Sequence, residues 1–85
     1  MTYRVVYAPE AARRIRRLDR AVKERVRSAV EKIAANPEGG KRLTGLLSDR
    51  WSWRVGDWRI LYKVLRAEVL ILVLTVGHRR EVYRR

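Results

Sequence analysis

The chain has 85 residues and a formal net charge of +12 at pH 7, from 21 Lys and Arg against 9 Asp and Glu. So short a chain allows one small domain, residues 1–85, because it cannot bury two hydrophobic cores. The absence of cysteine excludes disulfide scaffolds, thiolate metal sites and cysteine nucleophiles. The longest apolar run, from Val69 to Leu74, is far shorter than the roughly 20 residues of a membrane span. The N-terminus also lacks a signal-peptide pattern, so we expect a cytoplasmic protein with no membrane partner.

The first half of the sequence predicts a strand followed by two helices. Residues 2–8 are rich in Tyr and Val, which favours a strand, and Pro9 suits the first turn of a helix. Apolar residues then recur at helical spacing in two segments, the second over residues 20–35. These apolar positions are Ala12, Ile15 and Leu18 in the first helix, and Val22, Val26, Val30 and Ile33 in the second. Pro and Gly in residues 36–40 end the second helix, so the pair is expected to form an antiparallel helical hairpin.

The second half changes to the period-2 alternation of strands. Strands are predicted over residues 51–55 and 58–65, joined by a two-residue Gly-Asp turn. Residues 68–76 are apolar at nearly every position, which is typical of a central strand covered on both faces, and a basic tail follows over residues 77–85. The sequence therefore predicts an α+β fold in the order β-α-α-β-β-β. We expect a small, mostly antiparallel sheet with a helical hairpin packed on one face.

The Gly-Asp turn also predicts the register of the hairpin. Arg54 should lie opposite Arg59, on the sheet face away from the helices, together with Ser52 and Lys63. The side chains predicted to face the helices are Trp51, Trp53, Val55, Trp58, Ile60, Tyr62 and Val64. Like charges directly opposite each other repel, so an anion bound there would relieve the arginine pair. The alternative is that both arginines extend into solvent or pair with nearby carboxylates.

The charge and the tail suggest what this anion is. A net charge of +12 on so small a domain favours a polyanionic partner, most commonly nucleic acid, with an acidic protein as the alternative. His78, the single His, can exchange protons near neutral pH, and neighbouring arginines favour the neutral form that a base requires. A structural role for His78 is the alternative. Tyr83 can stack on a nucleobase or anchor the tail. No motif indicates a metal site or a cofactor.

Two segments of the second half carry a family resemblance. Residues 56–62 (GDWRILY) and 76–84 (VGHRREVYR), separated by a hydrophobic strand, resemble the RelE/ParE family of bacterial and archaeal toxins. The family pattern is approximately W-R-x-R-x-G-D-Y-R-x-x-Y, then a strand, then V-G-H-R-x-x-V-Y. The opening strand and helices fit as well, and so does the Lys-Arg-Leu stretch at 41–43 with Gly45. The resemblance covers essentially the whole chain.

The resemblance implies the toxin of a type II toxin–antitoxin pair, a RelE-like mRNA interferase that inhibits translation. Such an endoribonuclease cleaves mRNA in the ribosomal A site without a metal or cofactor. The 2′-OH attacks the adjacent phosphate, which leaves a 2′,3′-cyclic phosphate and a 5′-OH. The implied partners are the ribosome, mRNA and a cognate acidic antitoxin, whose extended segment and amphipathic helix would neutralise the basic surfaces.

The resemblance also implies roles for individual residues. Arg59 matches the phosphate-stabilising arginine of the family, and Arg54 occupies one of its basic hairpin positions. Arg79 lies at or beside the tail arginine assigned to stabilisation or to protonation of the leaving group. Tyr83 matches the tyrosine that stacks on or orients the substrate. The remaining basic residues expected to contact RNA are Lys63, Arg80 and Arg84.

One departure from the family pattern changes the assignment of the general base. Where many members have a basic residue two positions before Arg54, this chain has Ser52, so the lysine pair used as base in some members is absent. His78 becomes the leading candidate base. Two alternative functions stay open: a ParE-like poison of DNA gyrase that does not hydrolyse nucleic acid, and a non-catalytic nucleic-acid-binding module that uses the basic helices.

Overall fold

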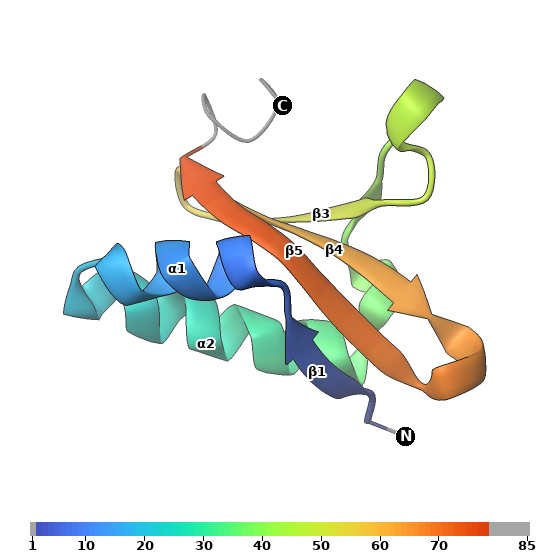
Figure 1. The fold of residues 1–85 in the computed structure, drawn as a ribbon, viewed down its shortest axis with the longest axis horizontal. Helices are drawn as coiled ribbons and strands as arrows, with labels where there is room; N and C mark the ends of the chain where they lie inside the picture. Colours follow the sequence, from blue (N-terminus) through green and yellow to red (C-terminus); the bar gives the residue numbers. More distant parts are fainter. Residues whose placement is uncertain (1, 79–85) are drawn as a thin grey trace.

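The computed structural model describes residues 2–78, which fold into two layers: a sheet, and two helices that cover one of its faces (Figure 1). The helices are α1 (Pro9–Arg17) and α2 (Arg20–Ala35). The strands are β1 (Arg4–Tyr7), β2 (Lys41–Arg42), β3 (Trp51–Val55), β4 (Trp58–Leu65) and β5 (Leu70–His78). The helices run antiparallel (Figure 1), which confirms the helical hairpin. Because they pack on a separate sheet, the α+β class is confirmed as well.

Local signals in the sequence explain where the helices begin and end. Pro9 occupies the first turn of α1, where its missing N–H costs nothing. Asp19 caps α2, because its side chain accepts a hydrogen bond from the Val22 amide at 3.0 Å. Pro37 follows the end of α2 and begins a short 3₁₀ turn, Pro37–Gly39. Neither helix within residues 2–78 has the length and apolar character needed to cross a membrane.

The strand order within the described residues is β1-β5-β4-β3-β2. β1 pairs with β5 in parallel, and the other neighbours pair antiparallel, as expected for a mostly antiparallel sheet. β5 lies between β1 and β4, so it is an interior strand of the sheet as expected. The helices cover only one of its faces, where Ile71, Val73 and Val76 are buried, whereas Leu70 and Leu72 are half-buried. The prediction missed β2, because two consecutive cations show no apolar alternation. The first strand is also shorter than predicted, at residues 4–7 instead of 2–8.

The register of the β3–β4 hairpin is the predicted one. Val55 pairs with Trp58 and Arg54 pairs with Arg59, on either side of the Gly-Asp turn. Gly56 has a φ of +61°, a conformation that residues with a side chain rarely adopt. The two faces of this hairpin are therefore separated as the sequence indicates, with Arg54 and Arg59 on the face away from the helices.

A β-bulge changes the alternation of β5. Leu61 pairs with Thr75 and Tyr62 pairs with Val73, so Leu74 is an extra residue without a partner on β4. From Thr75 onwards the side chains consequently swap faces relative to an uninterrupted strand. The predicted end of this strand at residue 76 was wrong, because β4 also pairs with Gly77 and His78 and extends the strand to residue 78.

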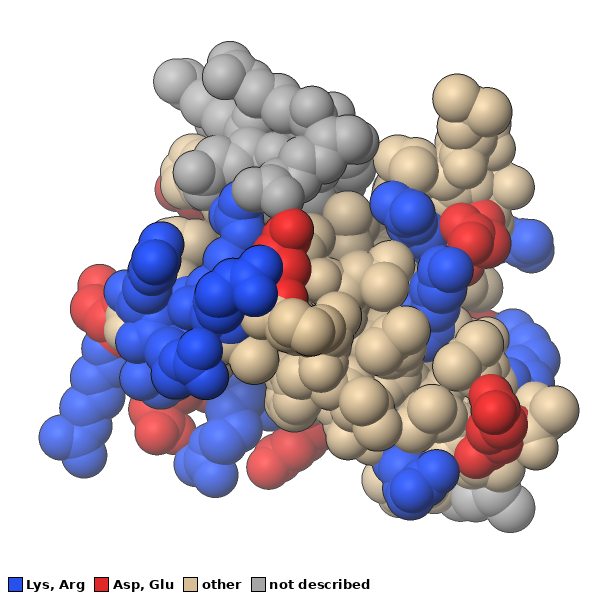
Figure 2. Space-filling model, in the orientation of Figure 1, with Lys and Arg blue, Asp and Glu red and all other residues tan. Residues whose placement is uncertain are grey.

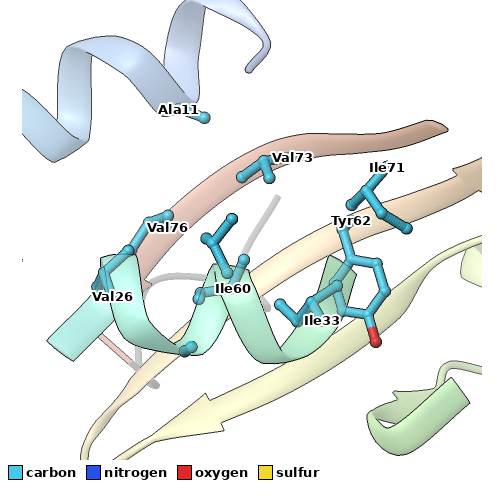
Figure 3. Close-up of a cluster of buried hydrophobic side chains, with 10 residues drawn as sticks. Ala11, Val26, Ile33, Ile60, Tyr62, Ile71, Val73 and Val76 are labelled. Carbon is cyan, nitrogen blue, oxygen red and sulfur yellow. The ribbon is translucent and has the colours of Figure 1, made fainter. Parts of the chain in front are cut away.

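The hydrophobic core lies between the helices and the sheet (Figure 3). Its largest fully buried side chains are Val26, Ile33, Ile60, Tyr62, Ile71, Val73 and Val76. The Tyr62 hydroxyl donates a 2.6 Å hydrogen bond to the carbonyl oxygen of Pro37, which satisfies a polar group inside the core. Burial raises the pKa of Tyr62 to about 12. Tyr62 thus ties the centre of the sheet to the turn after α2.

Candidate functional site

Cationic side chains gather on the sheet face away from the helices, which we call the basic face. Arg54 and Arg59 lie directly opposite each other on β3 and β4, and Lys63 follows on β4. β2 adds Lys41, which pairs with Ser52 and so shares its face. This arrangement places several positive charges around the small Ser52 side chain, where an anion would relieve their mutual repulsion.

An open depression lies at this face. Its volume of about 440 Å³ is within the range of small-ligand sites. Its lining residues are Gly39, Gly40, Lys41, Ser52, Trp53, Arg54 and Arg59. The small Ser52 side chain lies at its floor and is only 2% exposed. The depression therefore combines cations, a hydroxyl and an aromatic ring, which suits a phosphate attached to a nucleobase.

Arg54 and Arg59 differ in their surroundings. Arg54 is exposed, and its Nε donates a 3.2 Å hydrogen bond to the carbonyl oxygen of Gly56. Arg59 is half-buried, and its Nε is removed from solvent. A cation in a less hydrated position attracts an anion more strongly, because water screens its field less. Arg59 is thus the better placed of the two to stabilise charge on a phosphate.

Lys63 is engaged with an acidic residue. Its Nζ lies 3.2 Å from Oδ2 of Asp49, and the hydrogen bond from Lys63 holds the pKa of Asp49 below its ordinary value. Arg50 Nε lies 3.7 Å from the other oxygen of the same carboxylate. Asp49 therefore offsets part of the positive charge at the Lys63 end of the basic face.

The structure does not bring His78 together with Arg54 and Arg59. His78 pairs with Trp58 on the helix-facing side of the sheet, and the two rings meet edge to face with centroids 5.9 Å apart. The physical reason is the bulge at Leu74, which reverses the alternation of β5. Trp58 borders a second depression of about 480 Å³, which α1 lines with Glu10, Arg13, Arg14 and Arg17. The role of His78 as a base stays a prediction.

The other predicted tail residues, Arg79, Arg80, Tyr83 and Arg84, lie outside the described residues. Gly77 pairs with Arg59, so the described chain ends beside the basic face, as expected for the start of the tail. Within residues 2–78, no group of three His, Asp or Glu side chains is arranged to hold a metal ion.

The family of ParE toxins of type II toxin–antitoxin systems (parDE) matches residues 5–83. The chain belongs to this family. It is therefore the toxin of a type II toxin–antitoxin system and a member of the RelE/ParE superfamily. No curated protein sequence is significantly similar to it.

Solved structures of RelE toxins share the fold of this toxin. The RelBE2 toxin–antitoxin complex from Mycobacterium tuberculosis is similar at 27% identity and a TM-score of 0.85, over 93% of this chain and 100% of that one. The archaeal RelE–RelB complex from Pyrococcus horikoshii is similar at 25% identity and a TM-score of 0.77, over 95% and 99%. The isolated Escherichia coli RelE toxin, at 24% identity and a TM-score of 0.78 over 89% and 83%, shares the fold.

Two residues of the toxin's basic face were not singled out from the sequence. Lys41 belongs to a strand too short to be recognised by alternation, and only its pairing with Ser52 places it beside Arg54. Arg50 precedes β3 and continues the alternation of Ser52 and Arg54, so strand periodicity could have found it. Arg50 Nε, like Arg59 Nε, is buried, which adds a second cationic nitrogen with little hydration to this region.

Proposed function

We propose that this toxin is a ribosome-dependent endoribonuclease that cleaves mRNA and so inhibits translation in the cytoplasm. The observation that supports the proposal best is the Arg54–Arg59 pair, which lines an open depression beside Ser52 on the sheet face away from the helices. A phosphodiester is the anion that suits this depression, because two forked cations can hold its oxygens while the sugar and base extend along the sheet.

The reaction begins with attack of the 2′-oxygen on the adjacent phosphorus. The O2′–P bond forms, the P–O5′ bond breaks, and the products are a 2′,3′-cyclic phosphate and a 5′-OH. Arg59 stabilises the additional negative charge of the phosphorane, as a preorganised cation does in oxyanion-type catalysis. Arg54 holds the phosphate in position, and the ribosome orients the 2′-OH for in-line attack.

Two proton transfers complete the reaction. A base removes the proton of the 2′-OH, and an acid protonates the leaving 5′-oxygen. The family resemblance implies Arg79 for stabilisation or for protonation of the leaving group, and Tyr83 for stacking on or orienting the substrate. His78 is the candidate base because the lysine pair of some family members is absent here. Because His78 lies on the helix-facing side of β5, a His78→Ala variant tests its role separately. Unchanged cleavage by this variant would remove His78 from the mechanism without affecting the role of Arg59.

We also propose an acidic antitoxin as the partner of this toxin. Solved relatives are complexes with RelB antitoxins, and the net charge of +12 favours an acidic partner. Figure 2 shows Lys and Arg side chains gathered where α1 ends and α2 begins. Nearby, an apolar groove of about 360 Å³ runs between Ile15 and Val26, with Arg16, Lys23 and Arg27 among its lining residues.

An amphipathic antitoxin helix fits this groove, with its apolar side chains between α1 and α2 and its carboxylates against the cationic residues. The affinity should then fall steeply with salt, because exposed charge pairs are screened. An affinity that does not change with ionic strength would contradict the proposal.

The decisive experiment for the nuclease compares wild type with Arg59→Ala in a reconstituted translation system. Primer extension maps the 5′ ends of the mRNA, with naked mRNA as a control. We expect new 5′ ends that require ribosomes and that decrease about 100-fold or more with Arg59→Ala, the cost of removing one transition-state donor. Arg20→Ala, which removes the same charge from the exposed start of α2, should cleave like wild type.

A second candidate function is supported by the match to the ParE family over residues 5–83. A ParE-like toxin would poison DNA gyrase and leave mRNA intact. Intact mRNA from a chain that still arrests cell growth would refute the nuclease, and a gyrase supercoiling assay would then test the second candidate. If Arg59→Ala keeps nucleic-acid affinity but loses toxicity, a purely binding module is excluded.

A further inference from the structure

A further cationic depression, different from the one beside Trp58, adjoins the basic face at the edge of β3. Its volume is about 340 Å³, and it lies between α2 and β3. The lining residues are Glu24, Arg25, Ser28, Ala29, Lys32, Trp53, Arg54 and Val55. Trp53 and Arg54 also line the depression of the basic face, so the two hollows meet at these side chains.

The side chains that α2 contributes lie along one stripe of the helix. Arg25, Ser28 and Lys32 follow each other at spacings of three and four residues, which places them on the same side. Arg25 reaches over the β3–β4 turn, because a Cβ on Gly56 would lie 2.7 Å from its Nη2. Arg25 and Lys32 are both exposed, so their charges face solvent.

The acidic residue of this groove does not cancel its positive charge. Glu24 Oε1 lies 2.9 Å from Nη2 of Arg27, so its charge is already paired. Arg25, Lys32 and Arg54 remain as the cations of the groove. An extended anion lying here would thus meet positive charge along its whole length.

The edge of β3 leaves a passage between the two depressions. β2 pairs with β3 only at Trp51 and Ser52, so among the described residues no strand pairs with the outer edge of β3 at residues 53–55. Trp53 is half-buried and lies where this passage crosses the edge of β3. The Gly39 backbone packs against its indole, because a Cβ added to Gly39 would lie 3.0 Å from Cζ3 of Trp53. A rigid ring between cations is the usual arrangement of a single-stranded nucleic-acid channel.

We infer that single-stranded RNA continues from the basic face over the edge of β3 into the groove along α2. Arg25 and Lys32 bind phosphates of this flanking segment, and Trp53 contacts a base at the crossing. The inference deepens the proposed function and rests on it for the nature of the ligand. An acidic protein segment is the rival occupant, but the aromatic ring and the continuity with Arg54 and Arg59 favour a nucleic acid.

The test measures binding and not cleavage, using fluorescence anisotropy with a labelled single-stranded RNA of about ten nucleotides. The variant Arg25→Ala/Lys32→Ala is compared with Arg4→Ala/Arg20→Ala, which removes the same charge from exposed positions away from the groove. We expect about tenfold weaker binding for the first variant, from two exposed phosphate contacts. Its slope of log affinity against log salt should fall by about 1.4, or about 0.7 for each contact.

Length and ligand class provide the further controls. A trinucleotide that spans only the basic face should bind wild type and Arg25→Ala/Lys32→Ala equally. Equal losses of RNA affinity for the two double variants would overturn the inference, because the weaker binding would then come from the lower net charge of the protein and not from contacts in the groove. A loss of affinity for polyglutamate without a loss for RNA would also overturn it and assign the groove to an acidic protein.

The two proposals can fail separately. If Arg59→Ala abolishes ribosome-dependent cleavage while Arg25→Ala/Lys32→Ala binds RNA like the control variant, the channel is wrong and the nuclease stands. If the double variant loses RNA affinity in a protein that never cleaves mRNA, the channel stands and the nuclease is wrong.

Discussion

Replacement of Gly40 by alanine tests how tightly the floor of the basic face is packed. A Cβ at this position would collide with the Tyr62 hydroxyl and would lie 2.8 Å from the carbonyl oxygen of Ser52. Tyr62 is fully buried and hydrogen-bonded to Pro37, and the Ser52 carbonyl belongs to the β3 backbone. Neither neighbour can move without disturbing the core, so Gly40→Ala must destabilise the fold.

The expected magnitude follows from the two contacts. Insertion of a methyl group into a well-packed region costs about 1–3 kcal/mol, and displacement of the Tyr62 hydroxyl loses a hydrogen bond worth about 1 kcal/mol. We therefore expect Gly40→Ala to lower the free energy of unfolding by about 3 kcal/mol, and Tyr62→Phe by about 1 kcal/mol. In the Tyr62→Phe background the hydroxyl is absent, so Gly40→Ala should cost only about 2 kcal/mol.

Urea unfolding followed by tryptophan fluorescence measures this coupling of about 1 kcal/mol between the two substitutions. Gly45→Ala is the matched control, because space around Gly45 is open and its φ of +69° makes the substitution costly through the backbone alone. Its cost should not depend on Tyr62→Phe. Additive effects of Gly40→Ala and Tyr62→Phe within about 0.3 kcal/mol would refute the reasoning.

Other properties of the toxin follow from individual side chains. Burial raises the pKa of Tyr62 from 10.0 to about 12, so the stabilising effect of the protonated hydroxyl is fully present below pH 10 and is lost as the pH rises towards 12. Tyr62→Phe should therefore reduce the fall of Tm between pH 10 and 12. The hydrogen bond from Lys63 lowers the pKa of Asp49 from 3.8, so this pair stabilises the loop above that pH and is lost on acidification; Asp49→Asn should weaken the acid dependence of Tm. Val69 adopts a left-handed conformation with φ 51°, and Val69→Gly should relieve about 1 kcal/mol of strain in urea unfolding, whereas a loss of stability would show that its side-chain contacts outweigh the strain. Leu46 is fully exposed at 102%, so Leu46→Ala should change the free energy of unfolding by less than about 0.5 kcal/mol.

The register of the β3–β4 hairpin was predictable because two independent signals agree. A two-residue Gly-Asp turn sets which residues pair, and the alternation of aromatic and charged residues sets which face each residue occupies. Arg54 and Arg59 were therefore placed correctly from the sequence. Ser52 was also expected on their face, although nothing in the sequence indicates that it is buried there.

The face of His78 could not be predicted for a physical reason. β5 is apolar on both sides, so its sequence shows no alternation in which an extra residue would be visible. The bulge at Leu74 is visible only in the pairing with β4, and it decides the side on which His78 lies. β2 escaped prediction for a related reason, because Lys41 and Arg42 form a strand only through the partners that β3 provides.

The parallel pairing of β1 with β5 has a consequence for how the toxin is made. Arg4 pairs with Leu70, so strands from opposite ends of the described chain must meet before the sheet is complete. β5 also supplies Ile71, Val73 and Val76 to the core, so a nascent chain that lacks it cannot bury the helices. Translation that stops before Leu70 therefore yields no folded toxin, and the cell is exposed to the protein's activity only after β5 has been synthesised.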